Sequence, residues 1–322
     1  MRRAIQLDIA GHRLFGTLHE QDSPVSSPNR QACQRIGVLL LSFGQQPRSW
    51  VGDLGSSIAD RLGAQGYPVF RFDMPGLGDS PGAIPVHLEE LWRNIQLGAH
   101  ERPLFELCEE LSRRFSLKGL VIGGFCGGAV TALLAANARL PLLRGVALLE
   151  PDLALARTSS PSAVEASAPM SVDSFLESVD LLWARLHSPA SWRRLITGKA
   201  DFNFWLKLWY KLLDYAARKL AAVGRRTQSL PHETNHRAFN AWHVARRLRL
   251  PTLVISDGSP NRNKYYRAYG LQPGVSDPKS ALHWVEIPNT THAMVTGGAK
   301  DAVGNCFESW VAANFPLIPT EQ

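Results

Sequence analysis

The stretch Val121-Ile122-Gly123-Gly124-Phe125-Cys126-Gly127-Gly128-Ala129 determines what this chain folds into. It joins an apolar run, typical of a buried strand, to a run of small residues with helical character, and Cys126 stands at the junction. A residue at such a tight strand-to-helix turn projects clear of the sheet, and its neighbours two positions away must be small, as Gly124 and Gly128 are. The amides and the positive dipole end of the following helix favour a thiolate. The pattern therefore predicts a nucleophilic cysteine.

This glycine-rich turn has two other possible interpretations besides a nucleophilic cysteine. One is a buried and inert Cys126, because a free cysteine often behaves as a small hydrophobic residue. The other is a phosphate-binding loop, but the G-x-x-x-x-G-K-S/T pattern of that loop is missing from the sequence. The combination of strand, turn and helix favours the nucleophile.

Short apolar strands alternate with helices on both sides of this turn. The expected strands cover 4–9, 14–19, 36–41, 68–72, 117–123, 144–149, 251–256 and 283–287, and the expected helices cover 51–64, 88–115 with a break near Pro103, 127–139 and 300–315. Strands that alternate with helices of this length predict an α/β fold, in which helices cover both faces of a mostly parallel sheet.

The strand pattern stops between about Pro151 and Arg249. Residues 156–173 are rich in Ser, Ala and Pro, and apolar residues then recur at helical spacing. The simplest organisation is a single α/β core made of residues 1–150 and 250–322. An all-helical insertion, residues 151–249, follows the sixth strand.

Composition restricts the function classes. The 322 residues include 45% hydrophobic ones, which is enough to exclude intrinsic disorder over the whole chain. The formal charge of +7 permits an acidic partner, but no run of Lys and Arg interleaved with aromatic residues indicates nucleic-acid binding. Four cysteines without a C-x-x-C pattern fit neither a disulfide framework nor a zinc ribbon. With no signal peptide and no membrane span in the sequence, we expect a cytoplasmic protein.

Two segments together resemble the α/β-hydrolase superfamily, over about 36–150 and 251–315. Gly124-Phe125-Cys126-Gly127-Gly128 stands where most members carry G-x-S-x-G, and it is similar to the cysteine elbows of dienelactone hydrolases and polyhydroxyalkanoate synthases. Asp73-Met74-Pro75-Gly76-Leu77-Gly78-Asp79-Ser80 resembles the D-x-x-G-x-G-x-S segment after the family's fourth strand. The resemblance implies that residues 151–249 form the family's helical cap and that no cofactor or metal takes part.

The resemblance also implies a nucleophile, an acid and a histidine, in that order along the chain. His292, in the loop behind the last predicted strand, is the candidate base. Asp257 is the candidate acid or a simple turn residue, since relatives often carry the acid two positions later, where this chain has Ser259. Asp152 is the alternative acid. A Cys–His dyad is the remaining possibility, because a free thiol with a pKa of ~8.5 needs less activation than an alcohol.

The oxyanion hole of such a site takes the N–H of Gly127 and a second donor from the loop after Leu41. Phe43 and Gly44 are the two candidates for that donor, and the sequence does not distinguish them. A cysteine nucleophile forms a thioester acyl-enzyme, which is reactive toward amines and thiols. We therefore expect ester or thioester hydrolysis or acyl transfer on a small-molecule substrate rather than amide hydrolysis.

The amphipathic segment 202–215 carries Trp205 and Trp209, with basic residues around it. Its plainest interpretation is a cap helix whose apolar stripe, including both tryptophans, packs over the substrate pocket. A docking surface for an acyl carrier protein or for coenzyme A is the second interpretation, and an interfacial membrane helix is the third.

Two other functions are alternatives to acyl hydrolysis or transfer. The first is a non-catalytic α/β-hydrolase homologue that binds a small molecule, because the usual acid position holds Ser259. The second is a zinc peptidase using His232 and His236, which fall in an H-E-x-x-H pattern with Glu233. Pro231 before the pattern and the lack of a third ligand nearby argue against zinc.

Overall fold

A computed structural model of the chain describes residues 1–21, 35–42, 46–138, 140–156, 231, 233–296 and 298–317. The chain divides into two compact units, residues 1–159 with 231–322, and residues 160–230. The second unit lies outside the described residues, and so do Trp205 and Trp209 of the expected cap.

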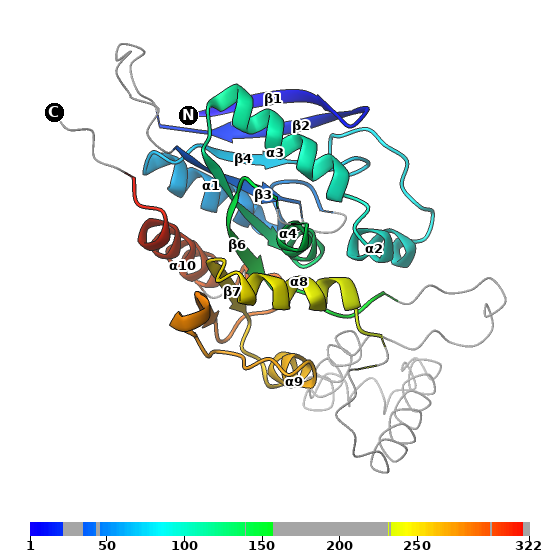
Figure 1. Ribbon diagram of the computed structural model, residues 1–322, viewed down its shortest axis with the longest axis vertical. Coiled ribbons are helices and arrows are strands. Elements are labelled where there is room, and N and C mark those ends of the chain that lie inside the picture. Colours follow the sequence, from blue (N-terminus) through cyan, green and yellow to red (C-terminus); the bar gives the residue numbers. More distant parts are fainter. Residues whose placement is uncertain are drawn as a thin grey trace, which may run out of the picture. The chain divides into compact units, whose positions relative to one another are not determined.

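An eight-stranded sheet forms the centre of this unit, in the order β1-β2-β4-β3-β5-β6-β7-β8 (Figure 1). The strands are β1 (Arg2–Ile9), β2 (His12–His19), β3 (Ile36–Leu41), β4 (Val69–Phe72), β5 (Gly119–Phe125), β6 (Leu143–Leu149), β7 (Thr252–Ser256) and β8 (Leu282–Glu286). β1, β2 and β4 pair antiparallel, and all strands from β4 to β8 in the sheet order pair parallel. The predicted α/β fold with a mostly parallel sheet is confirmed.

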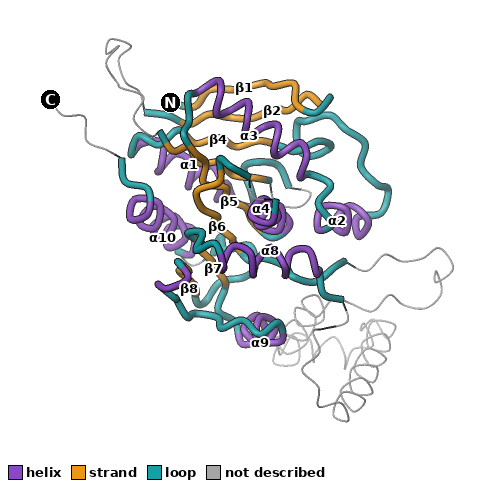
Figure 2. The backbone as a smooth tube through the Cα atoms, viewed as in Figure 1, coloured by secondary structure: helices purple, strands orange, loops and turns teal. Residues whose placement is uncertain are grey.

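Helices cover both faces of the sheet, as Figures 1 and 2 show. The described helices are α1 (Leu54–Ala64), α2 (Leu88–Gln96), α3 (Glu101–Phe115), α4 (Gly127–Asn137), α8 (His236–Arg247), α9 (Pro260–Ala268) and α10 (Ala299–Asn314), with 3-10 turns η1 (Val51–Asp53) and η3 (Pro278–Ser280). α1 and α10 pack together over a core that includes Leu40, Ile58 and Phe307. α2, α3 and α8 pack around α4 on the opposite face.

Two helices differ from the sequence expectation. The expected helix over 88–115 breaks at residues 97–100 rather than at Pro103, which lies in the first turn of α3. A proline is tolerated there because the N–H it lacks would have no partner inside the helix. α9 was not expected, because its polar sequence has no apolar periodicity. Ser259 and Pro260 were the available signals, since Ser259 Oγ accepts from Arg262 N at 3.2 Å and Pro260 opens the helix.

The loop after β4 is organised around Asp73, whose side chain is fully buried. Its carboxylate accepts from the N–H of Arg48 at 2.6 Å and from the N–H of Asp79 at 3.1 Å, and it pairs with the Arg48 guanidinium. Ser80 Oγ donates to the carbonyl of Asp73 at 2.7 Å. Gly78 has a φ of +51°, and a Cβ there would overlap the Asp73 carboxylate. The D-x-x-G-x-G-x-S segment is thus a tight loop that ties the β3–α1 connection to β4.

The chain leaves the sheet unit after β6 and returns to it through a short paired neck, residues 151–156 and 231–235. Ala154 and Thr234 form an antiparallel bridge. Leu155 N donates to Glu233 O at 2.7 Å, and Asn235 N donates to Leu153 O at 2.7 Å. Residues 231–249, which the sequence groups with the insertion, therefore lie in the same unit as the sheet, and α8 packs on α4.

Candidate active site

Cys126 occupies a strained turn between β5 and α4. Its backbone has φ 50° and ψ −110°, outside the regions that a residue with a Cβ ordinarily adopts. Cys126 N donates to Leu149 O of the neighbouring strand at 2.8 Å, and its carbonyl accepts from Val130 N at 3.1 Å. These bonds hold the strained conformation, and the side chain is partly exposed. The predicted elbow is present.

The two glycines that flank Cys126 are required by sterics. A Cβ on Gly124 would overlap the backbone of Gly128, and a Cβ on Gly128 would overlap the carbonyl oxygen of Ser42 at the end of β3. The helix can therefore start close to both β5 and β3 only because these positions lack side chains. The sequence argument for small residues at the elbow is explained by these contacts.

His292 lies between Cys126 and a carboxylate. The imidazole is hydrogen-bonded with Cys126, and its Nδ1 lies 3.6 Å from Oε2 of Glu150. The ring stacks on Phe125 with centroids 5.4 Å apart, so the residue before Cys126 orients the imidazole. The His292 side chain is 37% exposed, whereas Glu150 is completely buried. One imidazole therefore links a reachable sulfur to a buried acid.

The electrostatics of this group favour a protonated imidazole. Burial alone would lower the pKa of His292, but its hydrogen bonds and charge interactions with Cys126 and Glu150 outweigh burial and raise the pKa to about 10. At neutral pH the ring is then an imidazolium, held between Cys126 and the buried carboxylate of Glu150.

The carboxylate beside His292 is Glu150, which the sequence argument did not name. Glu150 follows β6 directly, with a φ of +46°. Its carboxylate also accepts from the N–H of Asp257 and from Arg262 Nε. A signal was present in the sequence, since a carboxylate directly after a buried strand marks the carboxyl edge of a parallel sheet, where ligands bind.

The two aspartates that the sequence analysis proposed as the acid have other partners, a correction to that expectation. The Asp257 carboxylate accepts from the N–H of Ser259 at 2.9 Å, as a turn residue does. The Asp152 carboxylate accepts from Tyr265 Oη at 2.5 Å, from Ala154 N and from Gln96 Nε2. Among the described side chains, the ion pair with His292 is made by Glu150. Asp257 lies next to this acid and contributes its backbone N–H to it.

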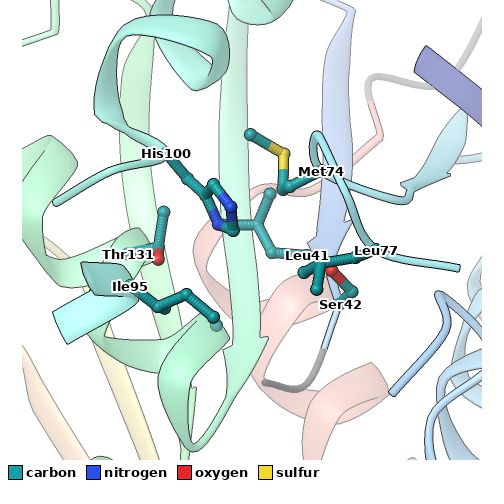
Figure 3. Close-up of a pocket in the computed structure, with 8 residues that line it drawn as sticks. Leu41, Ser42, Met74, Leu77, Ile95, His100 and Thr131 are labelled. Atoms are coloured by element: carbon teal, nitrogen blue, oxygen red, sulfur yellow. The ribbon is translucent and has the colours of Figure 1, made fainter. Parts of the chain in front are cut away.

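The oxyanion candidates are only partly described. Gly127 is the first residue of α4, directly after the elbow, where the sequence places the first oxyanion donor. Phe43 and Gly44 lie outside the described residues. Beside the elbow lies a small, tightly lined pocket (Figure 3), formed by Leu41, Ser42, Met74, Leu77, Ile95, His100, Gly128 and Thr131. Burial lowers the pKa of His100 to about 4, so this histidine is neutral at pH 7.

The H-E-x-x-H pattern is not carried on one helix. α8 begins at His236, Glu233 precedes it in a turn, and His232 lies outside the described residues. Within the described part of the chain, no group of three or more His, Cys, Asp or Glu side chains could hold a metal ion. No described helix is long and apolar enough to cross a membrane.

Comparison with known proteins agrees with this architecture. Residues 38–303 match a family profile described as the alpha/beta hydrolase family. A search of curated proteins finds no match.

Among solved structures, an α/β serine hydrolase without a lid from Xanthomonas campestris is similar, with a TM-score of 0.52, 14% identity, and 99% of this chain and 97% of that chain covered. Haloalkane dehalogenase DatA from Agrobacterium tumefaciens has a TM-score of 0.52, 16% identity and 97% of each chain covered. Dienelactone hydrolase from Anabaena variabilis has a TM-score of 0.51, 14% identity and 98% of each chain covered. At these identities the likeness is one of fold.

Proposed function

This chain belongs to the alpha/beta hydrolase family, and on that premise we propose that it is an ester or thioester hydrolase or acyltransferase that works through a covalent acyl-enzyme on Cys126. One observation carries the proposal. His292 lies between Cys126 and the buried carboxylate of Glu150, at the carboxyl edge of the sheet. A nucleophile, a base and an orienting acid in this order form the arrangement that activates a sulfur or oxygen for attack on a carbonyl.

The reaction proceeds in two halves. The Cys126 thiolate attacks the acyl carbonyl carbon, and the oxyanion accepts a hydrogen bond from the N–H of Gly127 and from a second donor in the loop that contains Phe43 and Gly44. The carbon–leaving-group bond breaks while imidazolium His292 gives its proton to the leaving group. This step leaves an S-acyl thioester and a neutral imidazole. His292 then takes a proton from water or from another acceptor, which attacks the thioester and releases Cys126.

The sulfur nucleophile favours thioester and acyl-transfer chemistry over amide hydrolysis. Exchange between the enzyme thiol and a substrate thioester is nearly balanced in energy, so acylation of Cys126 by a thioester is easily reversible. We propose a small-molecule ester or thioester as the acyl donor, with coenzyme A or an acyl carrier protein as the candidate thiol carrier. A reactive thiol requires a reducing compartment, which supports the cytoplasm as the location.

Alkylation of the intact protein by iodoacetamide, followed over pH with peptide mapping, tests this proposal. We expect Cys126 to react rapidly well below pH 8, and His292→Ala to remove that reactivity. Cys108 and Cys306 are internal controls, since burial raises the pKa of both thiols.

If Cys126 reacts no faster than Cys306, and if His292→Ala does not change its rate, the proposed enzymatic function is wrong. A non-catalytic binding protein of the same fold would then be the better account. A rapid reaction at Cys126 is followed by incubation with acyl thioesters, for which we expect a covalent acyl adduct on the Cys126 peptide.

A further inference from the structure

We infer that Arg262 is a positioning residue of this site, which fixes the Glu150 carboxylate in its charged form facing His292. The inference rests on the proposed function, because it concerns the acid of the Cys126–His292–Glu150 group. It assigns a role to α9, a helix whose residues have no place in the sequence-based account of the site.

Arg262 binds Glu150 at two points. Its Nε donates to Oε2 of the carboxylate, and its Nη2 donates to the backbone carbonyl of Glu150 at 3.1 Å. The other carboxylate oxygen accepts from the N–H of Asp257. Oε2 is therefore shared by the guanidinium and by Nδ1 of His292, 3.6 Å away. With both oxygens engaged, the carboxylate has one orientation in which it can face the imidazole.

The backbone contact matters as well, because Glu150 is held in an unfavourable conformation. Its φ is +46°, a left-handed value that is strained for a residue with a side chain. Glu150 N donates to Ile255 O at 2.9 Å, and the Arg262 guanidinium holds the carbonyl on the other side of the residue. This conformation turns the carboxylate away from the strand direction and toward the loop that carries His292.

Arg262 is itself held rigidly and shielded from solvent. It is 4% exposed, and its guanidinium lies over the rings of Tyr265 and Tyr266, 5.0 and 5.1 Å from their centroids. Two aromatic faces stabilise a buried cation in place of solvent. A planar guanidinium suits both the stacking and the forked contact with Glu150, whereas a lysine would supply only a point charge.

The charge of Arg262 decides the protonation state of the acid. Burial alone would raise the pKa of Glu150, but the cations of Arg262 and His292 hold it below its ordinary value. Other titratable groups face this cluster from the β6–α8 and β7–α9 connections, from α9 and from the elbow: Asp152, Asp257, Tyr265, Tyr266 and Cys126. Without Arg262, the buried Glu150 would take up a proton more easily, and the imidazolium would lose its counter-charge.

The test follows the rate of Cys126 alkylation by iodoacetamide over pH in the full chain. For R262M we expect the pH of half-maximal rate to rise by about one unit or more, and the rate at pH 7 to fall about tenfold. R262K keeps the charge, so its pH of half-maximal rate should stay near the wild-type value while its maximal rate falls at least about threefold. In an E150Q background, R262M should add no further shift.

R246M is the matched control. Arg246, on α8, is partly buried, and its guanidinium lies over an aromatic ring, 5.7 Å from the centroid of Trp242. Like Arg262 it donates to a backbone carbonyl, that of Ser280. R246M should lower the melting temperature without moving the pH profile of Cys126. A wild-type profile in a folded R262M, or an equal shift in R246M, overturns the inference.

If R262M does not unfold cooperatively, the R262K variant provides the test instead. An R262K variant with the same pH profile and the same maximal rate of Cys126 alkylation as wild type overturns the inference. A wild-type Cys126 that reacts no faster than in His292→Ala is a different outcome. It shows that the proposed function fails, and the role of Arg262 fails with it.

Discussion

Oε2 of Glu150 lies 3.6 Å from Nδ1 of His292, although the two residues are 142 positions apart along the chain. The sheet brings them together, because β6, β7 and β8 are consecutive neighbours and their carboxyl ends share one edge. Glu150 leaves the end of β6 and His292 lies in the loop after β8. The Glu150 carboxylate therefore reaches across β7, the strand that precedes Asp257, to meet the His292 imidazole.

Substitution of the acid tests this relationship. Glu150→Gln should lower the rate of Cys126 alkylation at pH 7 at least about tenfold, because the imidazolium loses its carboxylate. Asp257→Asn should stay within about threefold of wild type, since it keeps the N–H that Glu150 uses and changes only the contact with Ser259. Intact-mass kinetics measure both, and Asp152→Asn serves as a second control. An Asp257→Asn variant as slow as Glu150→Gln would restore Asp257 as the acid.

The elbow glycines predict a steric effect on stability. Gly128→Ala should destabilise the protein by about 3 kcal/mol or more, because its Cβ meets the carbonyl of Ser42 in a rigid backbone. Gly11→Ala is the control: a Cβ there meets nothing within 4 Å, and only its φ of +78° costs about 1–2 kcal/mol. Urea unfolding of both variants gives the comparison, and equal losses would argue against close packing at the elbow.

Asp73 and Asp79 both pair with Arg48, yet their contributions to stability should differ strongly. Asp73→Asn should cost about 3–5 kcal/mol, because it removes the charge from a buried carboxylate that faces three donors. Asp79→Asn should cost less than about 1 kcal/mol, since its side chain is 69% exposed. The two unfolding free energies are measured by denaturant titration, and a large loss for Asp79→Asn would contradict this account.

The raised pKa of His292 predicts a pH dependence of stability. The folded protein holds this proton up to a pKa of about 10, while the unfolded chain releases it near 6.5. The stabilisation is therefore complete below pH 6.5 and is lost as pH rises toward 10. Melting temperatures at pH 6.5 and pH 10 should differ more in wild type than in His292→Gln. A Cys126→Ala variant should also show the smaller difference, since it removes one of the two partners that raise the pKa of His292. Parallel curves for all three proteins would count against these interactions.

Much of the fold could be predicted because strands of a parallel sheet are buried on both faces and so appear as continuous apolar runs. The run at Ile36–Leu41 is β3, with the bounds expected. The break at 97–100 was harder to place, since Pro103 attracts attention as a helix breaker while being harmless in a first turn. α9 had no apolar stripe to identify it.

Residues of the candidate site whose position follows from the local sequence could be predicted. Residues that only the tertiary fold brings to the site could not. Cys126 follows from the elbow, and His292 follows from its position behind the last strand. Glu150 required the order of the strands and a left-handed backbone that turns its side chain, and neither is visible in a sequence where Asp152 and Asp257 lie nearby. Arg262 was hidden for the same reason, since its partner lies 112 positions away.

The paired neck at Ala154 and Thr234 has a practical consequence. Since the outgoing and returning segments of the neck are already hydrogen-bonded neighbours, a turn of a few residues could replace residues 157–230. The shortened protein would retain every described contact of Cys126, Glu150 and His292. The neck is in this sense a natural joining point, where the chain can be shortened without interrupting the sheet.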